Sequence, residues 1–417
     1  MQASAPECAT RPVQNMRMSN RSPSCPACGE PSIKHGTTRG KRQRYRCKTC
    51  RHTFTRDTND NATHAKWFAV FIHWLINGHS LKYTAQQHSI SLSTLQRRFR
   101  CFWYIQPPVP VDRQRVYDQV FIDGTYFNTK CLLVAADINH VISWFWCHTE
   151  DSWSYSRLLD TMAPPRIVTI DGHHGTHKAL QTIWPDTKIQ RCLVHIKRNI
   201  QRATGLHPSS AMGKALRRLS QDLLKVRTLD QAAEWTIKLH KFGQTFRHQL
   251  NEKTYVKDTP IEQIPASKRN NKQWWYTHYT HRGIYYQLEK LAKNQHLFTF
   301  LTEQSGDTEI KRTTNSLEGG INSPIKDLTY NHRGLRDEHQ RIACDWWLYL
   351  HTQLPGDPIE IARQQNWGKD ALAKATTLAN QEQQATNGHE DGRPAALDNA
   401  IDTAYNHNMG IRKGRMR

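Results

Sequence analysis

The pattern of apolar positions in the first third of the chain predicts three helices. Over residues 63–78 the apolar residues fall three or four positions apart, which is the spacing of one helix face. A short second helix is predicted over residues 81–88. A turn at 90–93 ends in a serine that suits an N-cap, and a third helix is predicted after it over residues 94–100.

The third of these helices carries polar and basic residues on its outer side, namely Gln96, Arg97 and Arg100. In a helix-turn-helix the last helix enters the major groove of DNA, where such side chains contact bases and phosphates. An ordinary three-helix connector shows the same period, so both interpretations of residues 60–105 stay open.

From residue 115 onward the apolar pattern changes to that of strands. Segments at 116–127, 131–138 and 141–148 are apolar or β-branched and are separated by short breaks, which predicts three successive antiparallel strands. The elements predicted next are a helix at 152–162, a strand at 166–172, a helix at 177–184, a strand at 187–194 and a helix at 195–204. This order is that of a ribonuclease-H-like sheet, and it predicts an α/β core whose first part covers residues 112–205.

The segments that follow differ from this core in composition. Residues 206–310 are mainly helical by pattern and rich in Lys, Arg and aromatic residues, which is typical of an α-helical insertion. Their aromatic group from Trp274 to Tyr286 is most simply the core of the insertion, and a stacking platform for an unpaired base is the alternative. Residues 311–355 return to helical spacing as the last part of the core.

The composition indicates a polyanionic partner. Lys and Arg number 58 against 36 Asp and Glu, which gives a formal net charge of +22. No apolar run approaches the roughly 18 residues that a membrane span needs, and residues 1–20 form a polar tail without a signal-peptide core. Residues 356–417 are predicted to be a polar, disordered tail. We therefore expect a cytoplasmic, nucleoid-associated protein that binds nucleic acid and no membrane.

Four of the ten cysteines form two Cys-x-x-Cys pairs with 18 residues between them, namely Cys25, Cys28, Cys47 and Cys50. Each pair can place two thiolates on one turn, and two facing turns complete a tetrahedral site that suits Zn²⁺ better than Mg²⁺ or Ca²⁺. This spacing predicts a zinc ribbon over residues 21–58 with a structural Zn²⁺. A disulfide pair and a redox motif are disfavoured by the reducing compartment and by the lack of a surrounding βαβ pattern.

Between the two cysteine pairs runs a basic stretch that contains Arg42, Arg44 and Arg46 beside Tyr45. Basic residues interleaved with an aromatic residue are typical of phosphate contacts, so the ribbon is predicted to touch DNA. The alternative is that these charges only keep a small hairpin in solution.

Two aspartates occupy the same local sequence at the ends of two predicted strands. Asp123 and Asp171 each follow a short apolar run and precede a glycine, which would let a backbone or a phosphate approach. The first and fourth strands lie side by side in the predicted sheet, which brings the two carboxylates close together. Two such groups repel unless a cation lies between them, so a divalent-metal site is predicted. Taken singly, an Asp-Gly pair after a strand is more often a turn.

A third carboxylate is needed to hold two Mg²⁺ or Mn²⁺ ions for phosphoryl transfer, and Glu318 is the candidate. It has a concrete alternative role, because Asn315 and Glu318 have the spacing of a helix capping box. Gly319-Gly320 directly afterwards is poor helix sequence. The presence of these two glycines therefore needs a reason other than helix formation, such as close passage of substrate. The rivals on spacing alone are Asp327, Asp337 and Glu338.

Three stretches of the chain resemble Mutator-type bacterial insertion-sequence transposases. They are Asp171-Gly172 through Leu180 with Trp184-Pro185, then Gln190 to Asn199, then Thr314-Asn315-Ser316-Leu317-Glu318-Gly319-Gly320-Ile321-Asn322. The resemblance covers residues 115–350. It implies a DDE catalytic core of ribonuclease-H-like fold, interrupted by an α-helical insertion before the glutamate and preceded by regions that read terminal repeats.

The resemblance also implies roles for individual residues. Asp123, Asp171 and Glu318 take the three metal-ligand positions, and the family's Cys-x-x-His signature falls on Cys192 and His195. These last two could ligate zinc, shape the active site, contact the bound strand or form a buried structural pair. The candidates for phosphate contacts are Lys197, Arg198, Arg312 and Lys326.

A DNA transposase is therefore the leading hypothesis. It would bind the terminal inverted repeats of double-stranded DNA, cleave there, and transfer the freed 3′-OH ends to target DNA as a homodimer or a larger synaptic complex. A ribonuclease-H-like nuclease would use the same metals but would join no ends. A zinc-ribbon DNA-binding regulator with an inactive core is the alternative that is not an enzyme.

Overall fold

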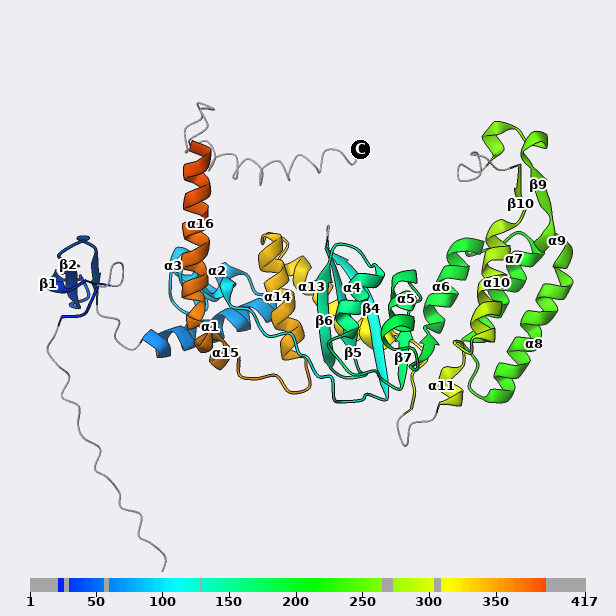
Figure 1. Ribbon diagram of the computed structural model, residues 1–417, viewed down its shortest axis with the longest axis horizontal. Helices are drawn as coiled ribbons and strands as arrows, with labels where there is room; N and C mark the ends of the chain where they lie inside the picture. Colours follow the sequence, from blue (N-terminus) through cyan, green and yellow to red (C-terminus); the bar gives the residue numbers. More distant parts are fainter. Residues whose placement is uncertain are drawn as a thin grey trace, which may run out of the picture. The chain divides into compact units, whose positions relative to one another are not determined.

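The computed structural model of the chain describes residues 22–25, 30–55, 60–127, 130–264, 273–303 and 309–387 (Figure 1). The chain divides into two compact units, Met1–Lys66 and Trp67–Arg417. The mixed α/β structure expected from the sequence is confirmed. None of the described helices is long and apolar enough to cross a membrane. The predicted tail over residues 1–20, the end of the second tail from residue 388, and Cys28 lie outside the described residues.

The first unit contains an antiparallel sheet in the order β1-β2-β3 within the segment predicted as a ribbon. Its strands are β1 (Ser32–Thr37), β2 (Gln43–Cys47) and β3 (Thr53–Thr55). Side chains alternate along β2, where Tyr45 and Cys47 are buried and Arg44 is exposed. Tyr45 stacks on Phe54 of β3 with ring centroids 5.9 Å apart. This pair gives a strongly basic strand one apolar face.

The three helices predicted next are α1 (Asp60–Asn77), α2 (Leu81–Gln87) and α3 (Leu92–Phe99). The side chains of Ser80 and Ser91 accept backbone N–H groups of Tyr83 and Thr94, so both serines are N-caps. Helix α3 therefore begins two residues earlier than predicted, because Ser91 and not Ser93 caps it. Gln96, Arg97 and Arg100 are exposed on α3, as the pattern predicted.

Residues 358–387 are helical, contrary to the expectation of a disordered tail from residue 356. They form α15 (Pro358–Gln364), the 3₁₀ turn η6 (Asn366–Gly368) and α16 (Lys369–Asn387). Trp367 is buried, and its ring centroid lies 6.4 Å from that of Phe68 on α1. Gln365 and Gln106 also exchange hydrogen bonds between side chain and backbone. One tryptophan and one amide pair thus order a segment whose composition is otherwise that of a tail.

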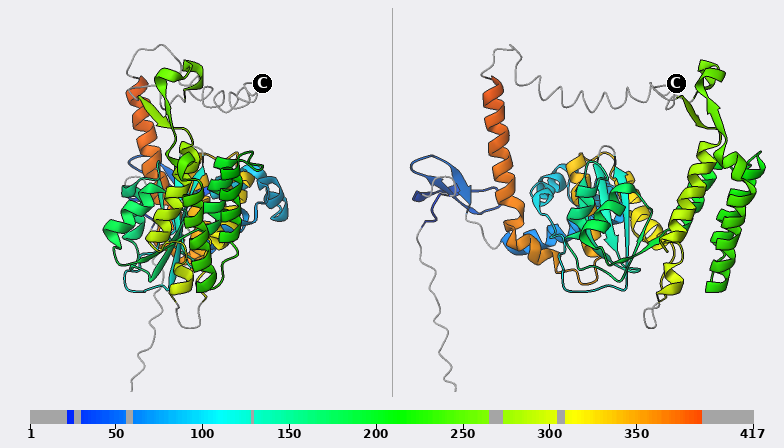
Figure 2. Two further views of the ribbon diagram at one scale, coloured as in Figure 1. Left: turned by 90° about the vertical axis from the view of Figure 1, so that its right-hand side faces the viewer. Right: turned by 45° about the vertical axis from the view of Figure 1, so that its right-hand side comes forward.

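A five-stranded sheet in the order β6-β5-β4-β7-β8 forms the centre of the second unit (Figures 1 and 2). The strands are β4 (Gln119–Phe127), β5 (Lys130–Ala136), β6 (Val141–Cys147), β7 (Ile167–Ile170) and β8 (Lys188–Arg191). Strands β4, β5 and β6 pair antiparallel, while β7 runs parallel to β4 and β8 parallel to β7. The predicted order of elements is confirmed, and the first and fourth strands are neighbours as expected.

Helices cover both faces of this sheet. On one face α4 (Ser152–Leu159) and α5 (His174–Ile183) pack over inward residues of the strands, with Tyr155, Leu158 and Leu180 in a common apolar cluster. On the other face lies α14 (Asp337–Leu350), whose buried Asp345 accepts hydrogen bonds from the indole N–H groups of Trp144 and Trp146 at 2.9 and 2.7 Å. Alternate residues of β4 and β5 therefore serve two separate cores.

The segment between β8 and the last core helices forms a helical bundle beside the sheet (Figure 2). It contains α6 (Leu193–Thr204), α7 (Ala211–Leu223), α8 (Leu229–Thr245), α9 (Arg247–Asn251), α10 (Tyr279–Lys293) and α11 (Thr299–Thr302). Its own apolar cluster includes Trp235 and Tyr285. The insertion is not wholly helical, because β9 (Lys253–Tyr255) and β10 (Trp274–Tyr276) pair antiparallel, with the 3₁₀ turns η2 (Val256–Asp258) and η3 (Ile261–Gln263) after β9.

After the insertion the chain returns to the sheet through α12 (Asn315–Leu317), the π-helical turn η5 (Glu318–Asn322) and α13 (Ser323–Asn331), which leads to α14. A buried amide fixes this return. The side chain of Gln119 on β4 donates to the carbonyl of Lys311 at 2.5 Å and accepts its N–H at 2.8 Å. It also donates to Thr169 Oγ1 on β7 at 2.7 Å. The side-chain amide thus makes the pair of hydrogen bonds that a neighbouring strand would make, and it joins β4, β7 and the returning segment at Lys311.

We expect Gln119→Leu to destabilise the second unit by about 2–4 kcal/mol, because it leaves the buried N–H and carbonyl of Lys311 without partners. All 13 tryptophans lie at or after Trp67, so tryptophan fluorescence during urea denaturation reports on this unit. Gln221→Leu on the exposed face of α7 is the matched control and should change the free energy of unfolding by less than about 0.5 kcal/mol. Equal changes in the free energy of unfolding for Gln119→Leu and Gln221→Leu would show that the Gln119 amide does not anchor the segment at Lys311.

Candidate active site

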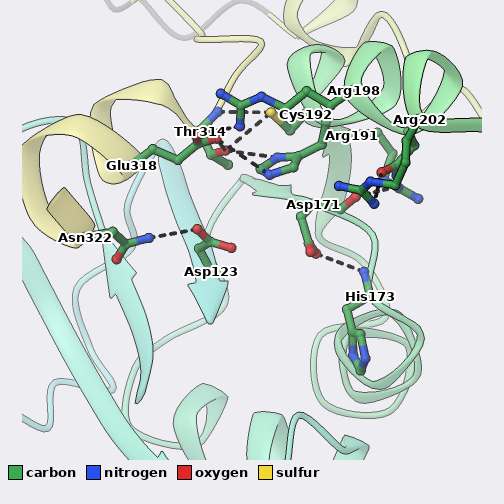
Figure 3. Close-up of polar contacts among 12 residues, drawn as sticks. Asp123, Asp171, His173, Arg191, Cys192, Arg198, Arg202, Thr314, Glu318 and Asn322 are labelled. Carbon is green, nitrogen blue, oxygen red and sulfur yellow. Dashed lines mark hydrogen bonds and ion pairs between the residues drawn. The ribbon is translucent and has the colours of Figure 1, made fainter. Parts of the chain in front are cut away.

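The two aspartates lie at the same edge of the sheet, on neighbouring strands. Asp123 is in the middle of β4 rather than at its end, but it comes directly after Ile122, the last residue of β4 paired with β7. Its counterpart Ile170 ends β7, and Asp171 follows it. The parallel register therefore brings the two carboxylates to the same edge of the sheet, as predicted, and Figure 3 shows Asp123 on β4 and Asp171 on the loop after β7.

The electrostatics of Asp123 indicate crowded negative charge. Burial, followed by the charges of Asp171 and Glu318, raises the pKa of Asp123 to about 7, although His195 acts in the opposite direction. A divalent cation held among these carboxylates would remove that penalty. Carboxylate oxygens are hard ligands, so the donor set fits Mg²⁺ or Mn²⁺.

The glycines after the aspartates make room for side chains of this chain. A Cβ on Gly172, which has φ +96°, would lie 1.7 Å from the guanidinium carbon of Arg191. A Cβ on Gly124 would lie 2.5 Å from a carboxylate oxygen of Glu150. Both glycines are therefore required by packing within the chain itself, and the approach of a phosphate or a passing backbone stays a prediction.

Asp171 is held by two backbone bonds beside it. Its Oδ1 accepts the N–H of His173 at 2.9 Å, and its carbonyl accepts Nη2 of the buried Arg191 at 2.5 Å. His173 is in turn the N-cap of α5 and lies 3.9 Å from Glu150. Arg191 and Glu150 were not singled out in the sequence, where neither stands in a recognisable spacing.

Glu318 is not part of the capping box that its spacing allows. The N-cap of α12 is Thr314, one residue before Asn315, and the carboxylate of Glu318 is bonded elsewhere. Glu318 begins the π turn η5, in which the N–H of Ser323 reaches back five residues to the carbonyl of Glu318. Gly319 and Gly320 in this turn face open space, since a Cβ on either meets no atom within 4 Å.

The carboxylate of Glu318 points toward α6 (Figure 3). It accepts Nη1 of Arg198 at 2.7 Å and the Thr314 hydroxyl at 3.3 Å, and it lies 3.6 Å from Nε2 of His195. Within the described residues, Cys192, His195 and Glu318 can bring three ligand atoms within 4.8 Å of one another, whereas Asp123, Asp171 and Glu318 do not form such a group. Arg198, a candidate for phosphate contact, is thus bonded to the candidate third ligand.

Asn322 is a further polar residue of the site that the sequence did not indicate. Its side-chain amide donates to Oδ2 of Asp123 at 2.8 Å, and it is buried. It lies four residues after Glu318, at the end of the π turn, and its bond ties this turn to β4. The rivals Asp327, Asp337 and Glu338 are exposed, on α13 and the first turn of α14.

Cys192 and His195 form a close pair at the start of α6. Cys192 is fully buried as the N-cap residue. Burial raises the pKa of its thiol, but hydrogen bonds from His195 and Thr314 outweigh burial and lower it below the ordinary value. The same bond with Cys192 raises the pKa of His195. The two opposite shifts in pKa therefore share one cause, the hydrogen bond between the thiol and the imidazole ring.

A second group of candidate ligands lies in the first unit. The Sγ atoms of Cys25, Cys47 and Cys50 can lie within 4.8 Å of one another, and those of Cys25 and Cys50 are 3.5 Å apart. Three thiols gathered on short turns fit a zinc site. On the same sheet Arg42 and Arg44 are exposed and Arg46 is half-buried. Lys197 on α6, in the second unit, is also half-buried.

Comparison with known proteins now relates the chain to a family. Residues 148–256 match the family model described as transposase, Mutator family. The chain is also similar to the transposase for insertion sequence element IS905 of Lactococcus lactis subsp. lactis, with 31% identity over 101 residues. That match covers 20% of this chain and 26% of the relative, so the chain spans about a quarter of the length of the curated relative. The resemblance to Mutator-type insertion-sequence transposases is confirmed, over a segment that contains Asp171, Cys192 and His195.

Gly172→Ala should destabilise the second unit more than Gly205→Ala, by about 1–3 kcal/mol. Both glycines have positive φ, at +96° and +82°, so both substitutions strain the backbone. Only at Gly172 does the added Cβ also meet Arg191, while Gly205 has no atom within 4 Å. Urea denaturation of the two variants measures the difference. Equal losses would mean that Arg191 moves aside freely and that only the backbone angle requires glycine.

Proposed function

We propose that the chain is a DNA transposase of an insertion sequence, which cleaves and transfers DNA strands by phosphoryl transfer at Asp123, Asp171 and Glu318. The observation that carries the proposal is that two aspartates directly follow the paired residues of two adjacent parallel strands, and that a glutamate after a long insertion comes near enough for its charge to act on Asp123. It occurs in a chain of which residues 148–256 match the Mutator transposase family.

The topology supports a ribonuclease-H-like core. Three antiparallel strands are followed by two parallel ones on the opposite side of the first, with helices on both faces. The helical bundle enters between β8 and the segment with Glu318, where the resemblance expects an insertion. We infer the domain boundaries given above on the same basis, except that the last part of the chain includes α15 and α16.

Asp123, Asp171 and Glu318 would hold two Mg²⁺ or Mn²⁺ ions. When bound, such ions activate the attacking oxygen and stabilise the leaving oxygen of an in-line displacement. Asn322 keeps the Asp123 carboxylate oriented through its amide, and the backbone N–H of His173 does the same for Asp171. To join them, Oε2 of Glu318 would exchange Arg198 for a metal ion while Oε1 keeps its bond to Thr314, which frees the exposed Arg198 for a DNA phosphate.

Recognition of the terminal repeats is assigned to the N-terminal helices and the ribbon. Ser91 caps α3 at its start. Gln96, Arg97 and Arg100 are exposed along this helix and at its end, which suits binding in a major groove. The basic strand β2 suits phosphate contacts, because its Arg44 and the preceding Arg42 are exposed. Two DNA ends must meet for one transfer, so we propose a homodimer or larger synaptic complex in the cytoplasm, associated with the nucleoid.

The cleavage assay uses a labelled duplex of the element's own end with Mg²⁺ and the full chain. Asp123→Asn, Asp171→Asn and Glu318→Gln should each lower strand cleavage by at least about 100-fold. Each removes a ligand of the metal ions that would stabilise the negative charge of the transition state. Asp327→Asn, at an exposed acid of α13, should cleave as the wild type does.

Other outcomes of this assay identify other functions. Cleavage without joining of ends to target DNA would favour a ribonuclease-H-like nuclease. Binding of the duplex without cleavage by any form would favour a DNA-binding regulator with an inactive core. Undiminished cleavage by Glu318→Gln would remove Glu318 from the proposed ligands.

The ribbon proposal predicts one bound Zn²⁺ per chain, held by Cys25, Cys28, Cys47 and Cys50. Metal analysis of the purified full chain should find about one equivalent, and Cys47→Ser should lose it while Cys147→Ser, at a half-buried cysteine of β6, retains it. A full equivalent of zinc in Cys47→Ser would mean that the metal lies elsewhere, with the group of Cys192, His195 and Glu318 as the first place to look.

A further inference from the structure

Thr314 stands at the meeting point of the side chains beside the third carboxylate. It is fully buried, and its hydroxyl oxygen lies 3.3 Å from Sγ of Cys192, 3.5 Å from Nδ1 of His195 and 3.3 Å from Oε1 of Glu318 (Figure 3). A threonine hydroxyl has one proton and two lone pairs, so it can donate to the sulfur or the carboxylate while it accepts from the ring.

The backbone of Thr314 extends the same connection in both directions. Its N–H donates to Sγ of Cys192 at 3.3 Å, and its carbonyl accepts the N–H of Glu318 at 2.9 Å. Cys192 itself donates its N–H to the carbonyl of Ile170 at 2.9 Å, directly before Asp171. A short path of hydrogen bonds therefore runs from the strand end that carries Asp171, through Cys192 and Thr314, to Glu318.

The other partner of Glu318 is of a different kind. Arg198 is half exposed on α6, and its long side chain can exchange the carboxylate for another anion. Thr314 has no such freedom, because it is buried, β-branched and bonded through its backbone on both sides. The lasting constraint on the position of Glu318 is therefore the threonine.

We propose that Thr314 is a positioning residue for the third carboxylate, which it holds at a fixed distance from Asp171 with Cys192 as the link. The inference rests on the proposed function in so far as Glu318 is a metal ligand. It assigns to Cys192 a structural part in the active site rather than a part in the chemistry, because Cys192 accepts the backbone N–H of Thr314 and the hydroxyl proton remains for Glu318.

Thr314→Val keeps the shape of the side chain and removes the hydroxyl, whereas Thr314→Ser keeps the hydroxyl. Partners that orient metal ligands typically contribute about 10–100-fold to metal affinity or activity, so Thr314→Val should weaken Mn²⁺ binding or slow cleavage by that factor. Thr314→Ser should stay within about threefold of the wild type on this scale. Affinity for the DNA end should be unchanged in both, because Thr314 is buried and presents no side chain to DNA.

Thr299→Val is the control for loss of a buried hydroxyl. Thr299 is equally enclosed, but its hydroxyl bonds backbone carbonyls of Ile189 and Gln295 and no carboxylate. It should lower thermal stability about as much as Thr314→Val and leave the dependence on Mn²⁺ as in the wild type. A purely structural threonine at position 314 would behave in the same way as this control.

Mn²⁺ binding to the full chain, followed by the electron paramagnetic resonance signal of the free ion, gives a readout that needs no activity. Weaker binding in Thr314→Val with recovery in Thr314→Ser supports the proposal even if the wild type cleaves no DNA, in which case only the proposed function fails. Equal Mn²⁺ binding and equal cleavage by Thr314→Val and wild type overturn the proposal. It is also overturned if Glu318→Gln binds Mn²⁺ as the wild type does, because there is then no ligand to position.

Discussion

The candidate site depends on one constraint, which is that the chain must return to the edge of its sheet after a long excursion through the insertion. Two buried glutamines satisfy it by acting as extra backbone. Gln190 on β8 donates to the carbonyl of Leu297 at 3.0 Å and accepts the N–H of Phe300 at 3.1 Å. Gln119 on β4 donates to the carbonyl of Lys311 and accepts the N–H of the same residue. Both lie in the interior, where an unpaired amide or backbone group would cost about 1–3 kcal/mol. The segment that returns from the insertion is thereby attached to the sheet at two places, Leu297–Phe300 and Lys311, before the chain reaches Glu318.

Each of the three acids is then held by a different neighbour. Asp123 is bonded by Asn322, Asp171 by the backbone of the following turn, and Glu318 by α6. Burial, with a smaller contribution from the charges of Asp171 and Glu318, raises the pKa of Asp123 to about 7 in this site. Such an arrangement is costly for stability alone and is expected where a cation completes the charge balance.

Periodicity and local motifs predicted the order of the sheet, the three N-terminal helices and the neighbouring aspartates, because each of these depends on residues within one or two elements. The bonds that finish the site join residues far apart in sequence, as in Gln119 with Lys311 or Thr314 with Cys192, and leave no period to detect. For the same reason the capping-box alternative was wrong. Asn315 and Glu318 have the right spacing, but the carboxylate of Glu318 is bonded to Arg198 of α6 and the N-cap is Thr314. Helices α15 and α16 were missed because one buried tryptophan outweighs a polar composition.

The segment with Glu318 is also fixed on its far side, and this limits how the carboxylate can move. Asn322 ties the end of the π turn to Asp123, and α13 leads into α14, which Asp345 anchors to two tryptophans of β6. His332, between these helices, is bonded at 2.8 Å to the carbonyl of Leu75 on α1. With Thr314 on one side and these contacts on the other, the backbone at Glu318 cannot shift without breaking buried bonds. Release of Oε2 from Arg198 toward the aspartates is therefore a movement of the side chain alone, during which Oε1 stays with Thr314.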